Sequence, residues 1–465
     1  MKFKRIPAVF AAVAMIASMT ACEGKSEKSG SEGKTESGDN ANIETEASEN
    51  EDSSNISGET IYWMSEYDIN PSGSQGRSVA LTLFEDVYGG KVEWIPTTRE
   101  TRSDDLSNRI LSGEPVDMVP FTSDVIPDGI SKEQYQPLDD YIDLNDELWS
   151  DVKGLADKMA YDGKHYVIPY GISNPSFLIY SRKMIKDEKL DDPYKLYESG
   201  KWDWDAFTDM MNKFVDNADG ETRYGCAGQF SKPLVQSTGQ GFVNFDGKTF
   251  SSNLSSPEIE KAELLVEEIN QQDLFDYTWY TSFPDDGSVL FYAMSPWALA
   301  ESNAKNPDED IFIVPYPKMP NTDDYYTCAD IDAKMLAANS DKGQAVAKYL
   351  ECERIALLED KYTEAAKKKA LEKTKSPGGD ELFITEEQYN AILAMTNPAE
   401  ASLVYDFGYG MGSEMSAQLY DYSKRGAINN LYDAIVSEYE GAPGSWDELR
   451  DEWKSVVENA VKKYN

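Results

Sequence analysis

The chain has few of the residues on which most nucleophilic enzymes and metal sites depend. Its 465 residues include one histidine and four cysteines, and no pair of cysteines has C-x-x-C spacing. A single histidine leaves no ordinary Ser/His or Cys/His nucleophile pair, and no zinc-ligand spacing is present. Basic residues are also scarce, because 44 Lys and Arg face 84 Asp and Glu, for a net charge of −40. Such a charge disfavours nucleic acid and anionic lipid, and it favours a neutral or cationic ligand.

The motifs of several common enzyme classes are absent as well. The sequence contains no G-x-S-x-G, no H-E-x-x-H and no P-loop. A glycosidase needs only two carboxylates, so the many acidic residues leave that activity as an alternative. We expect a binding protein rather than an enzyme, with no cofactor and no bound metal.

Long apolar runs are confined to the N-terminus. Lys2, Lys4 and Arg5 precede an apolar run from Ile6 to Met19, which is too short to remain as a membrane span. The run ends at Met19-Thr20-Ala21-Cys22, which is similar to the lipobox of bacterial lipoproteins. Residues 1–21 are therefore expected to be a signal peptide and Cys22 to carry the lipid. The alternative is an ordinary secretory signal with Cys22 incidental.

The segment after Cys22 has almost no large apolar residues. It consists mainly of Ser, Glu, Gly, Asn, Lys and Thr, and such a composition cannot bury a core. We expect residues 22–58 to form a lipidated, disordered acidic linker. The roughly 400 residues that follow exceed what one core usually serves, so two domains are the default expectation.

The first part of the folded body alternates strand-like and helical patterns. Residues 60–64, 91–95 and 115–120 have the character of buried strands, and helical spacing lies between them, at about 74–88 and 104–112. This βαβαβ order predicts a largely parallel sheet with helices on both faces. Ligands bind at the carboxyl ends of such strands. Residues 63–67 and 121–124 are therefore expected near a ligand.

Five motifs in this order resemble the extracellular solute-binding proteins of ABC importers, the family that includes maltose-binding protein. They are Met159 to Tyr170 (MAYDGKHYVIPY), Leu178 to Lys183 (LIYSRK), Lys201 to Phe207 (KWDWDAF), Ala293 to Ala298 (AMSPWA) and Ile313 to Pro317 (IVPYP). The resemblance extends over nearly everything from Ile61 onward.

The resemblance implies an α/β fold of two lobes, joined by a hinge with the ligand in the cleft between them. The implied first lobe comprises residues 59–173 and a return at 316–372. The implied second lobe comprises residues 174–315 and 373–465. The crossings are expected near 172–176 and 314–317.

The resemblance and the strand ends together nominate ten ligand-binding residues. Trp297 stands where the family places an aromatic ring against a sugar, and Trp63 and Tyr67 follow the first strand. Glu66, Asp117, Asp124 and Asn174 lie in segments that match cleft-lining loops, Tyr170 leads into a crossing, and Asp330 and Asp332 follow the proline-rich return. The alternatives for these residues are core packing, helix capping and solvated surface. The sequence departs from the family at 327–332, where a glycine-rich turn is common.

The implied function is capture of a carbohydrate, an oligosaccharide, by a monomer that is anchored to the extracytoplasmic face of the cell membrane only through its N-terminal lipid. The partners would be the permease subunits of an ABC transporter, and nucleic acid is not expected. Two alternatives remain open: a receptor of the same fold for a polyamine, an amino-sugar or a polyol, and a surface lipoprotein without a transport role.

Overall fold

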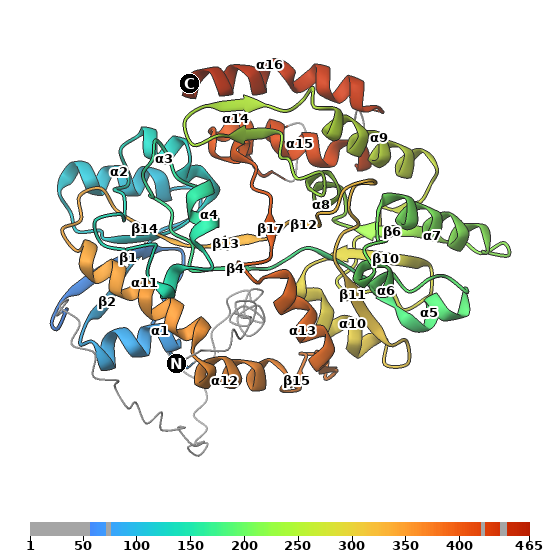
Figure 1. The fold of residues 1–465 in the computed structure, drawn as a ribbon, viewed down its shortest axis with the longest axis horizontal. Coiled ribbons are helices and arrows are strands. Elements are labelled where there is room, and N and C mark those ends of the chain that lie inside the picture. The colour runs from blue at the N-terminus through green and yellow to red at the C-terminus, as the bar shows by residue number, and fades with distance from the viewer. Residues whose placement is uncertain (1–55, 71–75, 420–423, 438–443) are drawn as a thin grey trace, which may run out of the picture.

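The computed structural model describes residues 56–70, 76–419, 424–437 and 444–465. These residues form two α/β lobes, each built around its own sheet, with the chain passing between them more than once (Figure 1). Cys22 and the linker up to residue 55 lie outside the described residues. In the described part of the chain, no helix is both long and apolar enough to cross a membrane.

The first lobe contains a four-stranded sheet in the order β14-β3-β1-β2. Strands β1, β2 and β3 run parallel along the pairs described and β14 is antiparallel to β3. The strands are β1 (Thr60–Ser65), β2 (Lys91–Pro96), β3 (Met118–Pro120) and β14 (Lys334–Leu336). The helices of this part are α1 (Val79–Thr82), the π-helix η2 (Leu83–Val87), α2 (Arg102–Ser112), η3 (Ser123–Val125), α3 (Asp128–Ser131), η4 (Glu147–Trp149), α4 (Lys153–Lys158), α11 (Gly343–Leu358) and α12 (Asp360–Ala370).

The second lobe contains a five-stranded mixed sheet in the order β11-β5-β10-β6-β9. Its strands are β5 (Phe177–Ser181), β6 (Tyr224–Gly228), β9 (Phe275–Asp276), β10 (Val289–Met294) and β11 (Ile311–Val314). The helices around it are α5 (Arg182–Asp187), α6 (Pro193–Glu198), α7 (Trp204–Asp216), α8 (Ser231–Gln236), α9 (Pro257–Gln271), η5 (Pro296–Ala298), α10 (Leu299–Lys305) and α13 (Glu386–Met395). Strands β10, β6 and β9 are parallel, so their carboxyl ends share one edge.

The C-terminal part of the chain adds a further helical layer beside a small hairpin. The hairpin is β7 (Val243–Phe245) with β8 (Phe250–Ser252), and β15 (Thr374–Lys375) pairs with β16 (Glu381–Leu382) elsewhere. The helical layer contains η6 (Phe407–Gly410), α14 (Ser413–Ser416), α15 (Ala427–Asp433), η8 (Ala434–Val436) and α16 (Trp446–Tyr464). Helix α16 lies over the hairpin and α15 at the top of the view in Figure 1.

Short paired strands lie where the chain crosses between the lobes. Strand β4 (Gly171–Ser173) pairs antiparallel with β13 (Asp330–Asp332), and β12 (Tyr326–Thr327) pairs parallel with β17 (Ser402–Leu403). All four strands lie between the two sheets in Figure 1. Three stretches of chain thus run side by side through the middle of the molecule.

Side-chain caps define where several helices begin. Asp203 accepts a hydrogen bond from the Ala206 amide at the start of α7, and Ser445 caps α16 in the same way. A cap satisfies an amide that has no partner within its helix. The apolar face of α7 is buried. Trp204, the first residue of α7, and Trp202, which precedes the helix, are core residues with at most 6% exposure.

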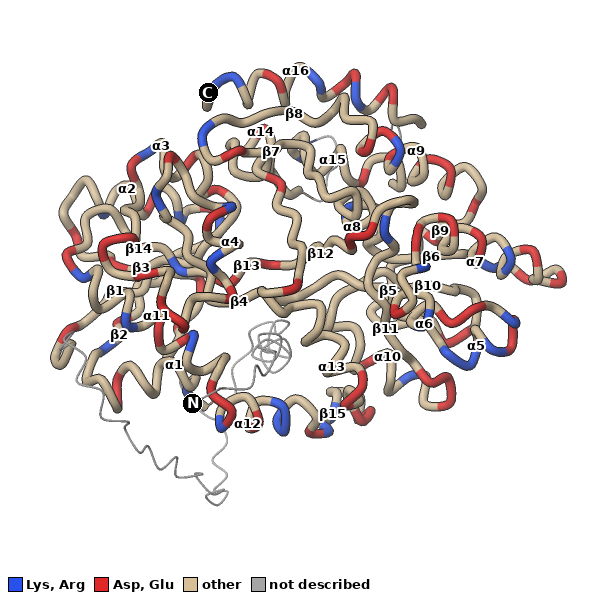
Figure 2. Tube along the Cα trace, in the orientation of Figure 1, with Lys and Arg blue, Asp and Glu red and all other residues tan. Residues whose placement is uncertain are grey.

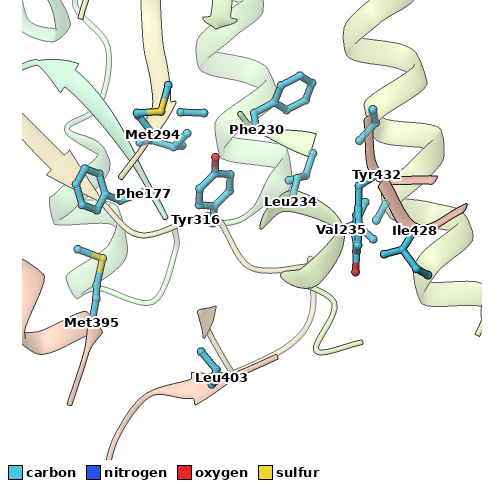
Figure 3. Packing of buried hydrophobic residues seen from close by; sticks show 14 of the residues in the cluster. Phe177, Phe230, Leu234, Val235, Met294, Tyr316, Met395, Leu403, Ile428 and Tyr432 are labelled. Atoms are coloured by element: carbon cyan, nitrogen blue, oxygen red, sulfur yellow. The ribbon is translucent and has the colours of Figure 1, made fainter. Parts of the chain in front are cut away.

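The core of the second lobe continues up to the crossings. Phe177, Met294, Tyr316 and Phe230 gather at the ends of their strands, and Leu403 on β17 lies nearby (Figure 3). The first lobe has its own cluster around Trp63, Phe84 and Tyr349. The larger cluster also includes first-lobe residues such as Met64, Leu106 and Val119, so apolar packing continues from one lobe to the other across the crossings.

Two boundaries expected from the sequence shift in the structure. Ile56, which the sequence places in the linker, is 3% exposed and belongs to the first lobe's core, because it packs with that cluster. The return expected from residue 316 begins later. The Lys318 backbone still bonds to Trp202 and Trp204, and the first sheet receives the chain only at β14. In the segment 160–170 a bridge between Tyr161 and Lys164 closes the Asp162-Gly163 turn, and residues 165–170 form no strand.

Candidate functional site

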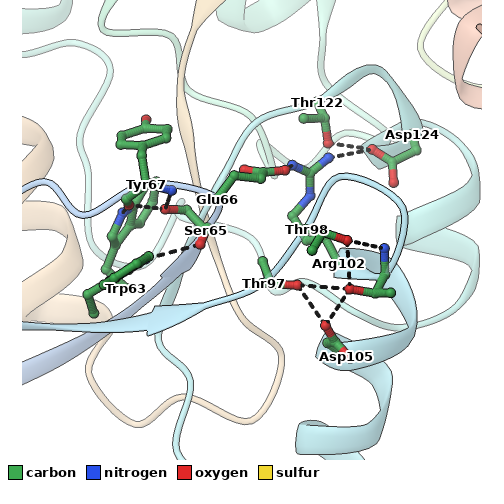
Figure 4. Close-up of polar contacts among 12 residues, drawn as sticks. Trp63, Ser65, Glu66, Tyr67, Thr97, Thr98, Arg102, Asp105, Thr122 and Asp124 are labelled. Atoms are coloured by element: carbon green, nitrogen blue, oxygen red, sulfur yellow. Dashed lines mark hydrogen bonds and ion pairs between the residues drawn. The ribbon is translucent and has the colours of Figure 1, made fainter. Parts of the chain in front are cut away.

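The carboxyl edge of the first sheet carries an exposed tyrosine on a buried tryptophan. Tyr67 follows β1 and packs edge-to-face on Trp63, with ring centroids 5.7 Å apart. The Trp63 indole Nε1 donates to the Tyr67 carbonyl at 3.0 Å, and Ser65 also bonds to the Tyr67 backbone (Figure 4). Tyr67 itself is 53% exposed. The strand end therefore presents a fixed aromatic ring to its surroundings.

An arginine joins the two acidic residues expected at this edge. Arg102, at the start of α2, forms an ion pair with Glu66 and lies 4.0 Å from Asp124. Thr122 donates to Asp124 within the loop after β3 (Figure 4). The Arg102 side chain is only 11% exposed. Glu66 and Asp124 are thus brought together, with part of their charge already balanced.

A buried lysine organises the residues next to the crossing. Lys334 on β14 donates to the Tyr170 hydroxyl at 2.7 Å and to Glu353 at 2.8 Å. Its ammonium lies 4.3 Å from the centroid of the Tyr170 ring and 5.9 Å from that of Trp63. Burial lowers the pKa of Lys334, but Glu353, Tyr349 and Tyr67 together raise it above its ordinary value. Lys334 is therefore a charged structural anchor beneath Tyr170.

Asp332 lies next to Lys334, and the pKa of its carboxyl is unusually high. Ser173 Oγ donates to Asp332 Oδ1 at 2.7 Å across the β4–β13 pair. Burial raises the pKa of Asp332 to about 7, although the Ser173 hydrogen bond and the charge of Lys334 oppose the rise. The carboxyl can therefore donate or accept hydrogen bonds near neutral pH.

Asn174 and Asp330 mark the point where the chain leaves β4. Asn174 has φ of +49°, in the left-handed region that asparagine tolerates better than most residues. Its Nδ2 donates to Asp330 Oδ2 at 3.1 Å. Asp330 is exposed. The pair links two crossing segments and engages only one of the two carboxylate oxygens of Asp330.

The second lobe contributes a tryptophan at the carboxyl edge of its sheet. Trp297 lies in η5, directly after β10, and is half-buried against the second-lobe core. Within the described residues, no hydrogen-bond partner is assigned to its indole Nε1. On the neighbouring parallel strand β6, Gly228 pairs with Ala293 of β10. Lys232 follows Gly228 by four residues, and Trp297 follows Ala293 by four residues.

The structure corrects the expectation for two residues. Trp63 does not follow the first strand but lies within it, with no exposed surface, because its ring fills the core beneath Tyr67. Asp117 precedes β3 and so lies at the opposite edge of the sheet. It is 5% exposed and accepts from the Tyr62 amide at 2.8 Å and from Ser340 Oγ at 2.6 Å. Both side chains are structural.

The sequence reasoning missed three charged residues of this region. Arg102, Lys334 and Glu353 hold the expected residues in place but are absent from the prediction. Lys334 had a usable signal, because it stands alone among apolar residues in Ala333 to Ala338, and a buried lysine needs a partner. Arg102 and Glu353 lie in polar helical sequence with no such signal.

Aromatic faces and mixed hydrogen-bonding groups make this arrangement suited to a hydroxyl-rich solute. Tyr67 and Trp297 offer rings, while Asp124, Asp330 and Asp332 offer carboxyl groups. An aromatic ring covers the C–H face of a sugar, and carboxyl groups accept from its hydroxyls. Among the described residues, no group of three or more His, Cys, Asp or Glu side chains could hold a metal ion.

A family model described as "Bacterial extracellular solute-binding protein" matches residues 80–370. The chain belongs to this family. The match covers more than half of the sequence and confirms the resemblance carried by the five motifs. A search of curated proteins gives no match.

Several solved structures share the two-lobed fold. The cyclic α-maltosyl-1,6-maltose binding protein of Arthrobacter globiformis is 15% identical, with a TM-score of 0.60, and the match covers 88% of this chain and all of the other. The sugar-binding protein MalE of Xanthomonas citri is 14% identical, with a TM-score of 0.59 and coverage of 87% and 98%. A solute-binding protein of Staphylococcus aureus in complex with maltose is 13% identical, with a TM-score of 0.57 and coverage of 88% and 99%. At these identities the likeness concerns the fold.

Proposed function

We propose that this solute-binding protein captures an oligosaccharide between its lobes for delivery to an ABC importer. The observation that carries the proposal is Trp297, a half-buried ring in η5 at the carboxyl edge of the second sheet, just after strand β10. A sugar ring stacked there would bury apolar C–H groups and leave its hydroxyls for polar partners. Related structures whose names describe maltose and maltodextrin ligands support a sugar over other solutes.

The opposite wall would come from the first lobe. Tyr67 offers a second ring, and Glu66, Asp124, Tyr170, Asn174, Asp330 and Asp332 offer polar groups around it. Closing the lobes on a solute requires that the solute bind the closed form more tightly than the open one. Contacts from both lobes to one ligand supply that difference.

The proposal includes an anchor and a partner. Cys22 would carry a lipid that holds the chain on the outer face of the cell membrane, and more than one acyl chain is enough for stable anchoring. The closed monomer would then dock on the permease subunits of its transporter. The first lobe would comprise residues 56–173 with a return from β14 to about residue 372, and the second lobe would comprise the remainder of the body.

A cationic solute such as an amino-sugar or a polyamine is the second candidate. The exposed Asp330 and the excess of acidic residues over both lobes favour it (Figure 2). An amine would gain an ion pair that a neutral sugar lacks.

A thermal-shift screen of the full chain separates these candidates. The panel comprises mono- and oligosaccharides, amino-sugars, polyamines, polyols and amino acids, each at several concentrations. Binding to the folded state raises the midpoint in proportion to the logarithm of ligand concentration. We expect a shift within one oligosaccharide series. A response to polyamines without any sugar response would contradict the sugar assignment.

A further inference from the structure

Lys232 occupies a position on the second lobe equivalent to that of Trp297. It is the second residue of α8, the helix that follows β6, and β6 is the parallel neighbour of β10. Gly228 on β6 pairs with Ala293 on β10, and Lys232 and Trp297 each follow the paired residue of their own segment by four positions. Both residues therefore leave the sheet at the edge where we place the solute.

The Lys232 side chain is largely covered, but its ammonium has no acceptor. Its Nζ lies 4.7 Å from the centroid of the Tyr409 ring and 5.9 Å from that of Tyr432. Within the described residues, no hydrogen bond and no ion pair is assigned to this ammonium. Burial lowers the pKa of Lys232, but the groups around it, Asp406 and Asp330 among them, raise it above its ordinary value.

Asp406 and Asp330 lie close enough to offset the charge of the Lys232 ammonium, but neither accepts a hydrogen bond from it. Asp406 accepts from the amides of Phe242 and Gly408 at 2.8 and 2.9 Å and from the Tyr432 hydroxyl at 2.8 Å. Its oxygens are therefore engaged elsewhere. Asp330 is held by Asn174. The ammonium offers three hydrogen-bond donors in a region that carries little net positive charge.

Tyr405 provides another donor that has no partner. It follows β17 in the crossing, and its buried hydroxyl makes no hydrogen bond. Its ring lies 6.1 Å from that of Phe121, which follows β3 on the first lobe. Both Lys232 and Asp124 lie close enough to affect the pKa of Tyr405, which burial raises. The hydroxyl thus lies between the lobes.

We propose that the Lys232 ammonium and the Tyr405 hydroxyl donate to oxygen atoms of the bound sugar and select a neutral oligosaccharide over an acidic one. The inference rests on the proposed function and narrows its substrate class. Hydroxyl and ring oxygens satisfy both donors without adding charge. A carboxylate would meet Asp124, Asp330 and Asp406 in the same region, and like charges repel at short range.

The test compares matched variants of the full chain by titration calorimetry. The ligands are the neutral oligosaccharide with the largest thermal shift and trigalacturonate as the acidic probe. Lys232→Met removes the ammonium at similar length, and Tyr405→Phe removes only the hydroxyl. The controls are Lys261→Met on the exposed side of α9 and Tyr389→Phe, whose hydroxyl is also buried without a partner. Unliganded melting points show whether each variant folds, and Lys232→Arg provides a variant that keeps the charge.

We expect Lys232→Met to raise Kd for the neutral sugar about tenfold or more, because the lost donor is charged. Tyr405→Phe raises it by a smaller factor, Lys232→Arg retains part of the affinity, and both controls stay within about twofold of the parent chain. Trigalacturonate binds more weakly than the neutral sugar. Unchanged affinity in both site variants, or tighter binding of trigalacturonate, overturns this inference and leaves the proposed function intact. If no sugar in the panel binds, the proposed function fails and the inference fails with it.

Discussion

Trp297 is the side chain on which the proposed sugar contact depends most. Its ring is half-buried against the second-lobe core, which fixes its orientation, and one part remains open at the sheet edge. A residue held in this way can stack on a ligand without losing much conformational freedom on binding.

Trp297→Ala is expected to weaken oligosaccharide binding by about 10- to 100-fold, which corresponds to about 1.5–3 kcal/mol of lost apolar burial. Trp297→Phe keeps part of the ring and loses less. Trp279→Ala is the matched control, because Trp279 is 62% exposed in another loop of the same lobe. Titration calorimetry gives the affinities. Equal losses in Trp297→Ala and Trp279→Ala would remove Trp297 from the site.

The carboxyl of Asp332 makes stability depend on pH. Its pKa of about 7 in the folded chain exceeds the roughly 3.9 of an unfolded aspartate, so the folded state binds more protons between these values. This carboxyl therefore lowers the free energy of unfolding as pH rises from about 4 to 7.

Asp332→Asn removes that titration while keeping an oxygen that accepts from Ser173. We expect the variant to gain about 1–2 kcal/mol relative to the parent chain at pH 8, with a smaller difference at pH 4.5. Urea unfolding at both pH values measures the two free energies. A difference that does not vary with pH would show that Asp332 ionises normally.

The sequence indicated the positions of residues that follow a strand, and it misplaced the end of β1; contact of these residues with a ligand stays a prediction. Glu66, Tyr67 and Asp124 lie at the expected edge. Strand β1 continues for two residues past Trp63, so Trp63 lies within the strand. Its side chain faces the core rather than the site, because side chains alternate between the two faces of a strand. Lys232 and Arg102 carried no local signal, because their importance arises from contacts made by distant segments.

At the scale of elements, the crossing between β4 and β5 combines backbone strain with a side-chain link. Asn174 adopts a positive φ and bonds to Asp330 on β13. The strain is specific to the exit from β4, where the chain turns toward the second sheet. The substitution of this residue separates the two contributions.

Asn174→Ala is expected to lower the free energy of unfolding by about 1–2 kcal/mol, because alanine is strained in the left-handed region and makes no bond to Asp330. Asn174→Gly relieves the strain and loses only the bond, so its cost is smaller. Chemical denaturation of both variants measures the difference. A glycine variant less stable than the alanine variant would contradict a left-handed Asn174.

The elements themselves were largely predictable. The helical spacing at 104–112 indicated α2 within about two residues, and the parallel order of the first strands followed from the alternation of strand-like and helical segments. The crossing strands were harder to predict from the sequence, because strands of two or three residues show almost no alternation of apolar and polar residues. Their pairing is determined by the approach of the two lobes.

For the whole molecule, the proposed anchor separates the folded body from the membrane. Cys22→Ser is expected to abolish incorporation of labelled palmitate and to release the chain from washed membranes, since no acyl chain would remain to hold it. The lipid label and the distribution between membrane and soluble fractions are measured together. Continued labelling of Cys22→Ser would refute lipidation at this residue.

The central claim is that one solute contacts both lobes. Hydrogen exchange of the full chain, measured with and without the saturating oligosaccharide identified in the screen, tests it directly. We expect slower exchange in the segments around 65–68 and 121–125 of the first lobe and around 229–232 and 295–299 of the second. Protection confined to one lobe, or found only outside these segments, would contradict capture between the lobes.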